Sequence, residues 1–304
     1  MACLVQSVFR TLSSGVSTFN RDQLPRYLDK FVNPIWKDHF VDEITPADVH
    51  EMIFTHLKNV SDLTRLNYLK TIKRFFSAAI EEGLLLRNPA LGIKVKKHES
   101  VKGVLNKTEI DTLLMSAHNL NHRFFHHWSV ALLTGMRSGE LYALRWTDAA
   151  FEPGLIHVTK SWSKLNGEGP TKSGKNRIVP MSNECKRFLA ELKLKALDHE
   201  FVLPRLNEWE RGMAARVLRD FCEGIGITPI SFHDLRATFI TQLLGNGVSL
   251  AKVMTIVGHS ELKTTQGYLR MCGRDVIGAT EELRIEIPRG STEVSNVFDF
   301  RRSE

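Results

Sequence analysis

Apolar residues recur every three or four positions over most of the chain, which is the spacing of helices that bury one face. One long helix is predicted to begin after Ser61 and to end at Gly83, because glycine caps helices in a left-handed conformation. A shorter helix is predicted to begin at Thr45-Pro46, with Thr as its N-cap, and to run to about Leu57. The predicted buried stripe of the long helix contains Leu66, Leu69, Ile72, Phe76, Ala79 and Ile80.

The second half of the chain keeps the helical spacing and adds two short alternating runs. Leu155–Lys160 and Arg177–Pro180 alternate or are rich in β-branched residues, so we predict two strands around a Gly- and Lys-rich connection. Strands this short indicate a mostly α protein with a small β-sheet, an α+β fold. The helices predicted here span about 107–117, 121–134, 138–145, 183–197, 207–224, 232–245 and 249–257.

A break in the pattern divides the chain into two domains. Asn88-Pro89 interrupts the helical spacing, and the lysine-rich stretch that continues to Gly103 is predicted to be a solvated linker. A length of 304 residues fits two domains of ordinary size. The predicted parts are a lead (1–20), a helical domain (21–88), the linker (89–104), a second domain (105–275) and a C-terminal tail (276–304).

The composition excludes several classes of protein. Hydrophobic residues make up 42% of the chain and charged residues 25%, which excludes a disordered chain and a collagen-like repeat. The four cysteines form no C-x-x-C pair, so we expect reduced thiols in a cytoplasmic protein. The sequence has no run of 18 apolar residues and no signal-peptide pattern, so no membrane partner is expected. A net charge of +7 permits a nucleic acid as partner.

Three short segments contain side chains suited to chemistry. Arg137 lies in the segment TGMRSGEL, His233 and Arg236 lie in HDLRATF, and His259 and Tyr268 lie in VGHSELKTTQGYL. Taken singly, each segment has an ordinary explanation: an ion pair at a helix start, two neighbours on a solvated helix face, or a helix cap followed by a half-buried tyrosine.

Taken together, these side chains suit the cleavage of a phosphodiester without a metal ion. The two arginines supply planar, permanently charged donors for the non-bridging oxygens. A phenol is a weak nucleophile at neutral pH, so a neighbouring imidazole is needed to accept its proton. The chain has no D-x-D, D-D-E or H-E-x-x-H pattern, which argues against a metal-dependent nuclease or a zinc hydrolase.

The order and spacing of the segments resemble those of the tyrosine recombinases, or phage integrases. TGMRSGEL is similar to the block with their first catalytic arginine, and HDLRATF is similar to their H-x-x-R block. VGHSELKTTQGYL is similar to the block with their last histidine and their nucleophilic tyrosine. The resemblance covers about residues 105–272, and residues 21–83 fit the family's core-binding domain more loosely. It implies the catalytic residues Arg137, His233, Arg236, His259 and Tyr268.

The family also has a catalytic lysine on a turn between two strands. The segment TKSG at residues 171–174, just before the predicted strand Arg177–Pro180, is similar to that site. The resemblance therefore implies Lys172 for this role, with Lys175 as the alternative.

The resemblance implies a mechanism in which Tyr268 attacks a DNA phosphate and forms a 3′-phosphotyrosyl link. The arginines and His259 hold the non-bridging oxygens, His233 accepts the tyrosine proton, and Lys172 protonates the leaving 5′-oxygen. A 5′-hydroxyl from a partner duplex reverses the step, and two rounds pass through a Holliday junction. The intermediate keeps the bond energy, so neither a metal, nor ATP, nor any other cofactor is expected.

Double-stranded DNA at a specific site is the implied partner, and both domains are expected to contact it. The polar face of the long N-terminal helix can read bases or hold phosphates, and an ordinary solvated face is the alternative. The linker lysines are expected to follow phosphates, with plain solvation of the linker as the alternative. These expected contacts are Asn67, Lys70, Thr71 and Arg74 on the helix, and Lys94, Lys96 and Lys97 in the linker.

Three histidines recur four residues apart, a spacing that could indicate a metal site. They are His118, His122 and His126. No carboxylate motif accompanies them, so we interpret them as ordinary residues of a helix and expect no metal.

The tail contains apolar residues in a charged frame. The resemblance implies that such a segment docks on a neighbouring protomer and organises a homotetramer on DNA. A tail that packs on its own subunit, or that is disordered, is the alternative.

Integration or excision of a mobile element or phage is the expected role, with Xer-like resolution of chromosome or plasmid dimers as the alternative. Only about 20 residues precede the predicted helical domain, too few for an arm-binding module. A type IB topoisomerase-like enzyme and an inert DNA-binding regulator are disfavoured, because the H-x-x-R histidine is present and all six expected catalytic positions are filled. Accessory DNA-bending proteins are possible partners, and the DNA-bound protein would lie at the nucleoid.

Overall fold

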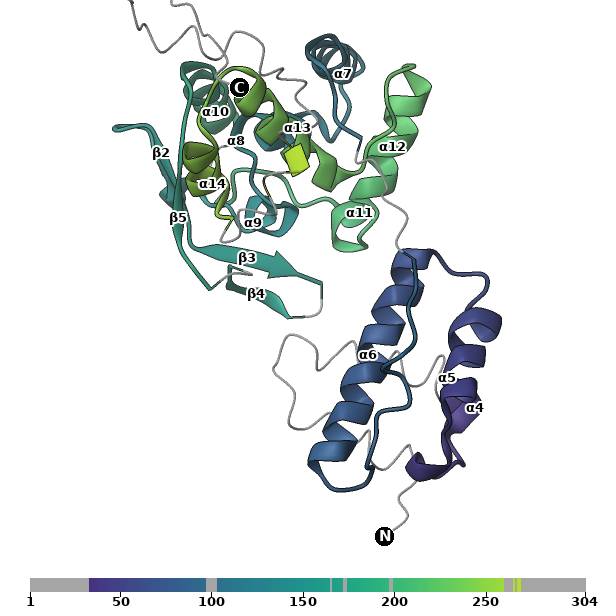
Figure 1. The fold of residues 1–304 in the computed structure, drawn as a ribbon. Helices are drawn as coiled ribbons and strands as arrows, with labels where there is room; N and C mark the ends of the chain where they lie inside the picture. The colour runs from purple at the N-terminus through teal and green to yellow at the C-terminus, as the bar shows by residue number, and fades with distance from the viewer. Residues whose placement is uncertain are drawn as a thin grey trace, which may run out of the picture. The chain divides into compact units, whose positions relative to one another are not determined.

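A computed structural model describes residues 33–96, 103–164, 166–171, 174–196 and 199–259, together with residues 265, 267 and 268. The chain divides into two compact units, Met1–Val101 and Lys102–Glu304 (Figure 1). Among the described residues, none of the helices combines the length and the apolar character needed to cross a bilayer.

The N-terminal unit is built around one long helix. Its elements are α4 (Asn33–Trp36), η2 (Val41–Glu43), α5 (Pro46–Glu51), η3 (Met52–His56) and α6 (Asp62–Glu81). Thr45 caps α5 as predicted, since its hydroxyl accepts a hydrogen bond from the Asp48 amide while the Asp48 carboxylate accepts one from the Thr45 amide. Helix α6 begins after its cap Ser61. Most of the predicted stripe is buried on α6, and Tyr68 and Phe75 add to it.

The chain after α6 folds back onto this helix. The Asn88 side-chain amide donates to the Lys73 carbonyl, and the Lys73 ammonium donates to the carbonyls of Leu91 and Ile93. Ala90 and Ile93 are buried in the core of the N-terminal unit. Ala90 and Ile93, which belong to the predicted solvated linker, are therefore part of this core, whereas Leu91 and Gly92 between them are exposed.

The C-terminal unit is mostly helical and carries two small antiparallel sheets, as predicted for the fold class. Its helices are α7 (Lys107–Asn119), α8 (Phe125–Thr134), α9 (Ser138–Tyr142), η4 (Trp146–Asp148), α10 (Asn183–Lys195), α11 (Asn207–Glu210), α12 (Ala214–Gly224), α13 (Phe232–Gly245) and α14 (Leu250–Val257). Its strands are β1 (Ala149–Ala150), β2 (Leu155–Val158), β3 (Lys160–Ser163), β4 (Gly167–Pro170) and β5 (Arg177–Pro180).

The two predicted strands are present, but the chain between them differs from the prediction. Strands β2 and β5 pair antiparallel, with Leu155 opposite Pro180, in a sheet of order β1-β2-β5. The connection between them is not a plain loop, because β3 and β4 form a separate hairpin within it. Lys160, predicted at the end of the first strand, begins β3 instead.

Some predicted helices are also shorter than expected, and the one predicted at 121–134 begins only at Phe125. The helix predicted at 207–224 is divided into α11 and α12 by Gly212, which has a left-handed φ of 76° that a continuous helix cannot contain. The helix predicted at 138–145 ends at Tyr142, and the chain turns into η4 soon afterwards.

Helices α8 and α13 pack against each other in the core of the C-terminal unit (Figure 1). Helix α8 is apolar over most of its length, and Trp128 is fully buried on it beside Phe124 and Phe221. Helix α13 also binds the chain where it enters this unit: the Leu105 amide donates to the Thr238 hydroxyl at 3.1 Å. The helix that bears the H-x-x-R segment is therefore held on several sides.

Candidate active site

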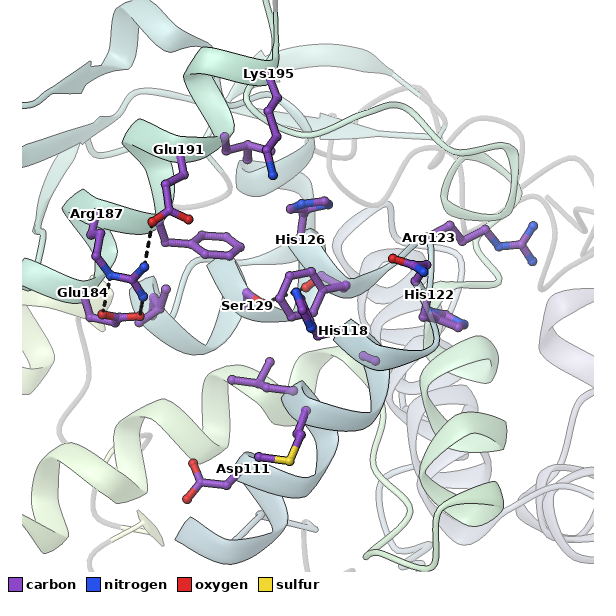
Figure 2. A pocket seen from close by; sticks show the side chains of 18 residues that line it. Asp111, His118, His122, Arg123, His126, Ser129, Glu184, Arg187, Glu191 and Lys195 are labelled. Atoms are coloured by element: carbon purple, nitrogen blue, oxygen red, sulfur yellow. Dashed lines mark hydrogen bonds and ion pairs between the residues drawn. The ribbon is translucent and has the colours of Figure 1, made fainter.

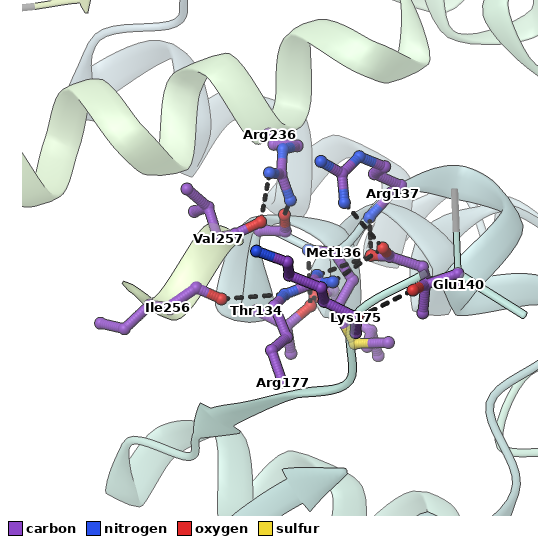
Figure 3. Close-up of polar contacts among 12 residues, drawn as sticks. Thr134, Met136, Arg137, Glu140, Lys175, Arg177, Arg236, Ile256 and Val257 are labelled. Atoms are coloured by element: carbon purple, nitrogen blue, oxygen red, sulfur yellow. Dashed lines mark hydrogen bonds and ion pairs between the residues drawn. The ribbon is translucent and has the colours of Figure 1, made fainter. Parts of the chain in front are cut away.

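Arg137 and Arg236 come together from segments about 100 residues apart in the sequence. Arg137 is the N-cap of α9, after the turn at Gly135, and Arg236 lies on α13 with only 2% of its surface exposed. The Arg236 guanidinium donates to the Gly135 carbonyl at 2.7 Å and to the Val257 carbonyl at 2.5 Å (Figure 3). Backbone groups from two other segments therefore fix this arginine.

The turn that brings Arg137 into place requires glycine at position 135. Gly135 has a φ of 61° and caps α8 in the left-handed region. A Cβ at this position would lie 2.2 Å from the Phe239 ring of α13. Both conformation and space therefore exclude a side chain at this position.

Glu140 joins two arginines to each other. It is buried on α9, and its carboxylate accepts hydrogen bonds from the amide and the guanidinium of Arg137 at 2.8 and 2.9 Å. The Arg177 guanidinium, from the start of β5, donates to both carboxylate oxygens at 2.7 and 2.6 Å (Figure 3). Its Nε also donates to the Ile256 carbonyl at 3.0 Å.

The cluster has an excess of positive charge, with three guanidinium groups around one carboxylate. Burial lowers the pKa of Arg236 to about 9, and the charges of Arg137 and Arg177 act in the same direction, so Arg236 is still charged at neutral pH. Burial alone would raise the pKa of Glu140, but Arg177 and Arg137 outweigh it and hold that pKa below its ordinary value. Such a cluster attracts an anion that accepts hydrogen bonds on two oxygens, such as a phosphodiester.

Tyr268 lies close enough to Arg236 for the two to interact electrostatically. Only 4% of Tyr268 is exposed, and it belongs to an apolar cluster with Ala237 of α13 and Val257 of α14. His259 follows Gly258, the left-handed cap of α14, and its Nδ1 lies 2.8 Å from the Thr265 hydroxyl. His233 is on the first turn of α13, one turn before Arg236, and is exposed.

The two candidate lysines differ in what the structure describes. Lys172 lies outside the described residues. Lys175 is described, and its carbonyl accepts a hydrogen bond from the Thr171 hydroxyl at 2.8 Å. Figure 3 shows the Lys175 side chain pointing toward the arginine cluster.

The β3–β4 hairpin, which precedes these lysines, is held against α9 and the segment after it. The rings of Trp162 and Tyr142 lie 4.3 Å apart. The Arg145 guanidinium donates to both carboxylate oxygens of Glu168, at 3.0 and 2.9 Å. The hairpin is therefore held against α9, the helix that Arg137 caps.

Most of the expected DNA contacts that the structure describes in the N-terminal unit are exposed. Asn67, Lys70 and Arg74 are exposed along α6, whereas Thr71 is half-buried and donates its hydroxyl to the Asn67 carbonyl. In the segment after α6, Lys94 and Lys96 are exposed and Lys97 lies outside the described residues.

The three histidines belong to a groove of about 730 Å³ that none of the predicted catalytic residues lines (Figure 2). They do not share one helix: His118 is on α7, His126 is on α8, and His122 lies in the turn between them, where Asn121 has a positive φ of 48°. Burial lowers the pKa of both His122 and His126. In the part of the chain that is described, no three His, Cys, Asp or Glu residues are arranged to hold a metal ion.

Glu140 and Arg177 are the members of the cluster that the sequence did not single out. Glu140 stands three residues after the N-cap Arg137, which is the spacing of a capping-box carboxylate and was available as a signal. Nothing in the pattern around Arg177 distinguishes it from any basic residue at the start of a strand.

Comparison with known proteins places the chain in a family. The model of the phage integrase family matches residues 103–272, more than half of the chain. Tyrosine recombinase XerD of Listeria innocua serovar 6a is 27% identical over 234 residues, which cover 71% of this chain and 74% of that protein. XerD of Oceanobacillus iheyensis is 27% identical over 275 residues, which cover 83% and 86%.

Solved structures share the fold at lower identity. The Tn1549 transposon integrase in complex with a circular intermediate DNA is similar with a TM-score of 0.79 and 18% identity, over 92% of this chain and 98% of that one. A lambda integrase tetramer bound to a Holliday junction is similar with a TM-score of 0.71 and 19% identity, over 89% and 77%. The chain belongs to the phage integrase family. It is a tyrosine recombinase, an enzyme that breaks and rejoins DNA.

Proposed function

We propose that this recombinase cuts and rejoins double-stranded DNA at a specific site through a 3′-phosphotyrosyl intermediate on Tyr268. The observation that carries the proposal is the joint position of Arg137, Arg236 and Tyr268, which sequence distance alone would not bring together. The excess positive charge around Glu140 suits the phosphate that the tyrosine attacks.

The cleavage step forms one bond to phosphorus and breaks another. The Tyr268 oxygen attacks the phosphorus, His233 accepts the phenolic proton, and the bond to the 5′-oxygen breaks. Lys172 gives the leaving oxygen its proton, so a free 5′-hydroxyl results. Arg137, Arg236 and His259 donate to the non-bridging oxygens, where removal of one donor typically costs about 100- to 1000-fold in rate.

In the second step a 5′-hydroxyl from the partner duplex attacks the phosphotyrosyl bond and releases Tyr268. Two such rounds exchange all four strands through a Holliday junction. No metal and no ATP enter the scheme, because the phosphotyrosyl bond keeps the energy of the broken phosphodiester. A homotetramer, brought together through the tail of residues 276–304, is the proposed assembly, and accessory DNA-bending proteins are proposed as helpers.

We further propose integration or excision of a mobile element or phage as the biological role. The similarity to the Tn1549 integrase, which extends over 92% of this chain and 98% of that one, supports this role. The 27% identity to an XerD protein supports resolution of chromosome or plasmid dimers as a second candidate role. Recombination assays separate the two. Joining of element ends favours the first role, and conversion of plasmid dimers to monomers without such ends favours the second.

The test of the chemistry uses nicked duplexes from the DNA that flanks the gene. Wild-type protein and Tyr268→Phe are incubated with them in EDTA, and protein–DNA adducts that resist SDS are sought. We expect an adduct with the wild type only, with DNA binding unchanged in the variant. An adduct in the Tyr268→Phe variant would refute the assignment of the nucleophile. Retarded bands without any adduct would favour an inert binder, and relaxation of supercoils without site preference would favour a topoisomerase.

A further inference from the structure

Arg177 makes several side-chain hydrogen bonds outside the sheet to which its strand belongs. Only 8% of its side chain is exposed, although it begins β5, which pairs on one side only with β2. Its guanidinium donates three hydrogen bonds, two to the Glu140 carboxylate and one to the Ile256 carbonyl. The three acceptors come from α9 and α14, so one side chain joins three segments.

Each of these segments lies next to a residue of the proposed reaction in the sequence or holds one by a hydrogen bond. Glu140 holds Arg137, and β5 begins five positions after Lys172 in the sequence. Ile256 is three residues before His259 and next to Val257, whose carbonyl holds Arg236. Arg177 is therefore the point at which the supports of three proposed catalytic residues, Arg137, Arg236 and His259, meet.

The end of α14 is shaped to accept Arg177. A Cβ on Gly258 would lie 2.8 Å from Cδ of Arg177, and Gly258 has a φ of 69°. The arginine stem therefore occupies the space that a side chain at position 258 would need. This close approach fixes the distance between β5 and the backbone that leads into His259.

We propose that Arg177 is a positioning residue of the recombination reaction, holding Arg137, Arg236 and His259 in one arrangement. The inference rests on the proposed function and adds a residue that the family resemblance did not supply. The planar guanidinium is essential to it, since a lysine ammonium has the charge but not the fixed fork that serves two carboxylate oxygens and a carbonyl at once.

An ordinary buried ion pair is the competing explanation, and it predicts different results. Such a pair affects folding stability, whereas a positioning residue affects the rate of a folded enzyme. Arg177→Met leaves Glu140 paired with Arg137, so the carboxylate keeps a partner and the variant is expected to fold. Arg187→Met is the matched control, because Arg187 pairs with Glu184 and Glu191 on the exposed side of α10.

The rate measurement compares wild type, Arg177→Met, Arg177→Lys and Arg187→Met under single-turnover conditions on a nicked duplex. Misplacement of catalytic groups by about 1 Å costs about 100-fold, so we expect a loss of that order in adduct formation for Arg177→Met. DNA affinity should stay within about twofold, and Arg177→Lys should recover part of the rate, since it restores the charge and one donor. Arg187→Met should resemble the wild type. Equal rates in Arg177→Met and wild type, or a rate loss matched by an equal loss of binding, would overturn the proposal.

A second measurement does not depend on cleavage. The amides of Gly258 and His259 both donate to the Met254 carbonyl, so their hydrogen exchange reports the end of α14. Arg177→Met should speed this exchange, and Arg187→Met should not. If wild type forms no adduct, the proposed function fails, and unchanged exchange in Arg177→Met would then also reject the positioning role.

Discussion

Replacing Gly135 with alanine tests whether the turn before Arg137 is as constrained as its geometry indicates. Gly135 has a φ of 61°, and a left-handed conformation costs a non-glycine residue roughly 1–2 kcal/mol. The new methyl group would also lie 2.2 Å from the Phe239 ring, and overpacking of this kind costs about 1–3 kcal/mol. The expected loss in the free energy of unfolding is therefore about 2–5 kcal/mol.

Gly212→Ala is the control that separates the two costs. Gly212 has a φ of 76°, but a Cβ there would meet nothing within 4 Å. It should lose only the backbone part, roughly 1–2 kcal/mol. Urea unfolding followed by tryptophan fluorescence measures both variants, because four of the five tryptophans, Trp128, Trp146, Trp162 and Trp209, lie in the C-terminal unit.

The two variants should also differ in activity. The Gly135 carbonyl accepts a hydrogen bond from Arg236, so a displaced turn should slow adduct formation, whereas Gly212→Ala should not. Phe239→Leu added to Gly135→Ala should recover the steric part of the lost stability. The reasoning is refuted if Gly135→Ala is no less stable than Gly212→Ala, or if Phe239→Leu gives no recovery.

Three further predictions concern a buried carboxylate, a buried histidine and two exposed basic residues. Glu140→Gln removes the carboxylate between two arginines and should lower the free energy of unfolding, measured in urea, by about 3–5 kcal/mol. Glu184→Gln, at the surface, is the control, and an equal loss in that variant would contradict the prediction. Burial lowers the pKa of His127 from 6.5 to about 4, so the unfolded chain takes up a proton at a higher pH than the folded protein does. The free energy of unfolding should therefore fall by roughly 3 kcal/mol as the pH drops from about 6.5 to 4. His127→Gln should flatten that part of the stability profile, and an unchanged profile would show that other groups cause the fall. Lys70→Ala and Arg74→Ala should weaken DNA binding and each reduce the slope of log affinity against log salt by about 1, and unchanged slopes would exclude phosphate contacts by this face of α6.

Sequence patterns predicted helices well where one face is buried. The stripe of α6 and the Thr45 cap of α5 depend on contacts between near neighbours in the chain, and the structure contains both. The packing of Ala90 and Ile93 onto α6 was missed, because the surrounding lysines dominate the local composition. A charged stretch can still contribute two apolar side chains to a core.

The residues of the candidate site were also easier to predict from local patterns than from contacts between distant segments. Spacing and order drew attention to Arg137 and Arg236, but not to Arg177, whose importance depends on contacts with α9 and α14, 37 and 79 positions away. The histidines show the opposite failure: a regular spacing suggested one helix face, yet the turn at Asn121 places them on separate elements. Periodicity describes local geometry, and it carries no information about contacts between distant segments.

The way in which Arg236 is held has a consequence for how this protein tolerates substitution. Its two recorded partners, at Gly135 and Val257, are main-chain carbonyls, which every amino acid possesses. At position 257 any apolar residue of suitable size preserves the acceptor, so sequence drift there leaves the guanidinium in place. Arg137 and Arg177 depend instead on the carboxylate of Glu140, which few substitutions can replace. The Val257 support of Arg236 is therefore robust to mutation, unlike the Gly135 support, whereas Arg137 and Arg177 both lose a partner when Glu140 is replaced.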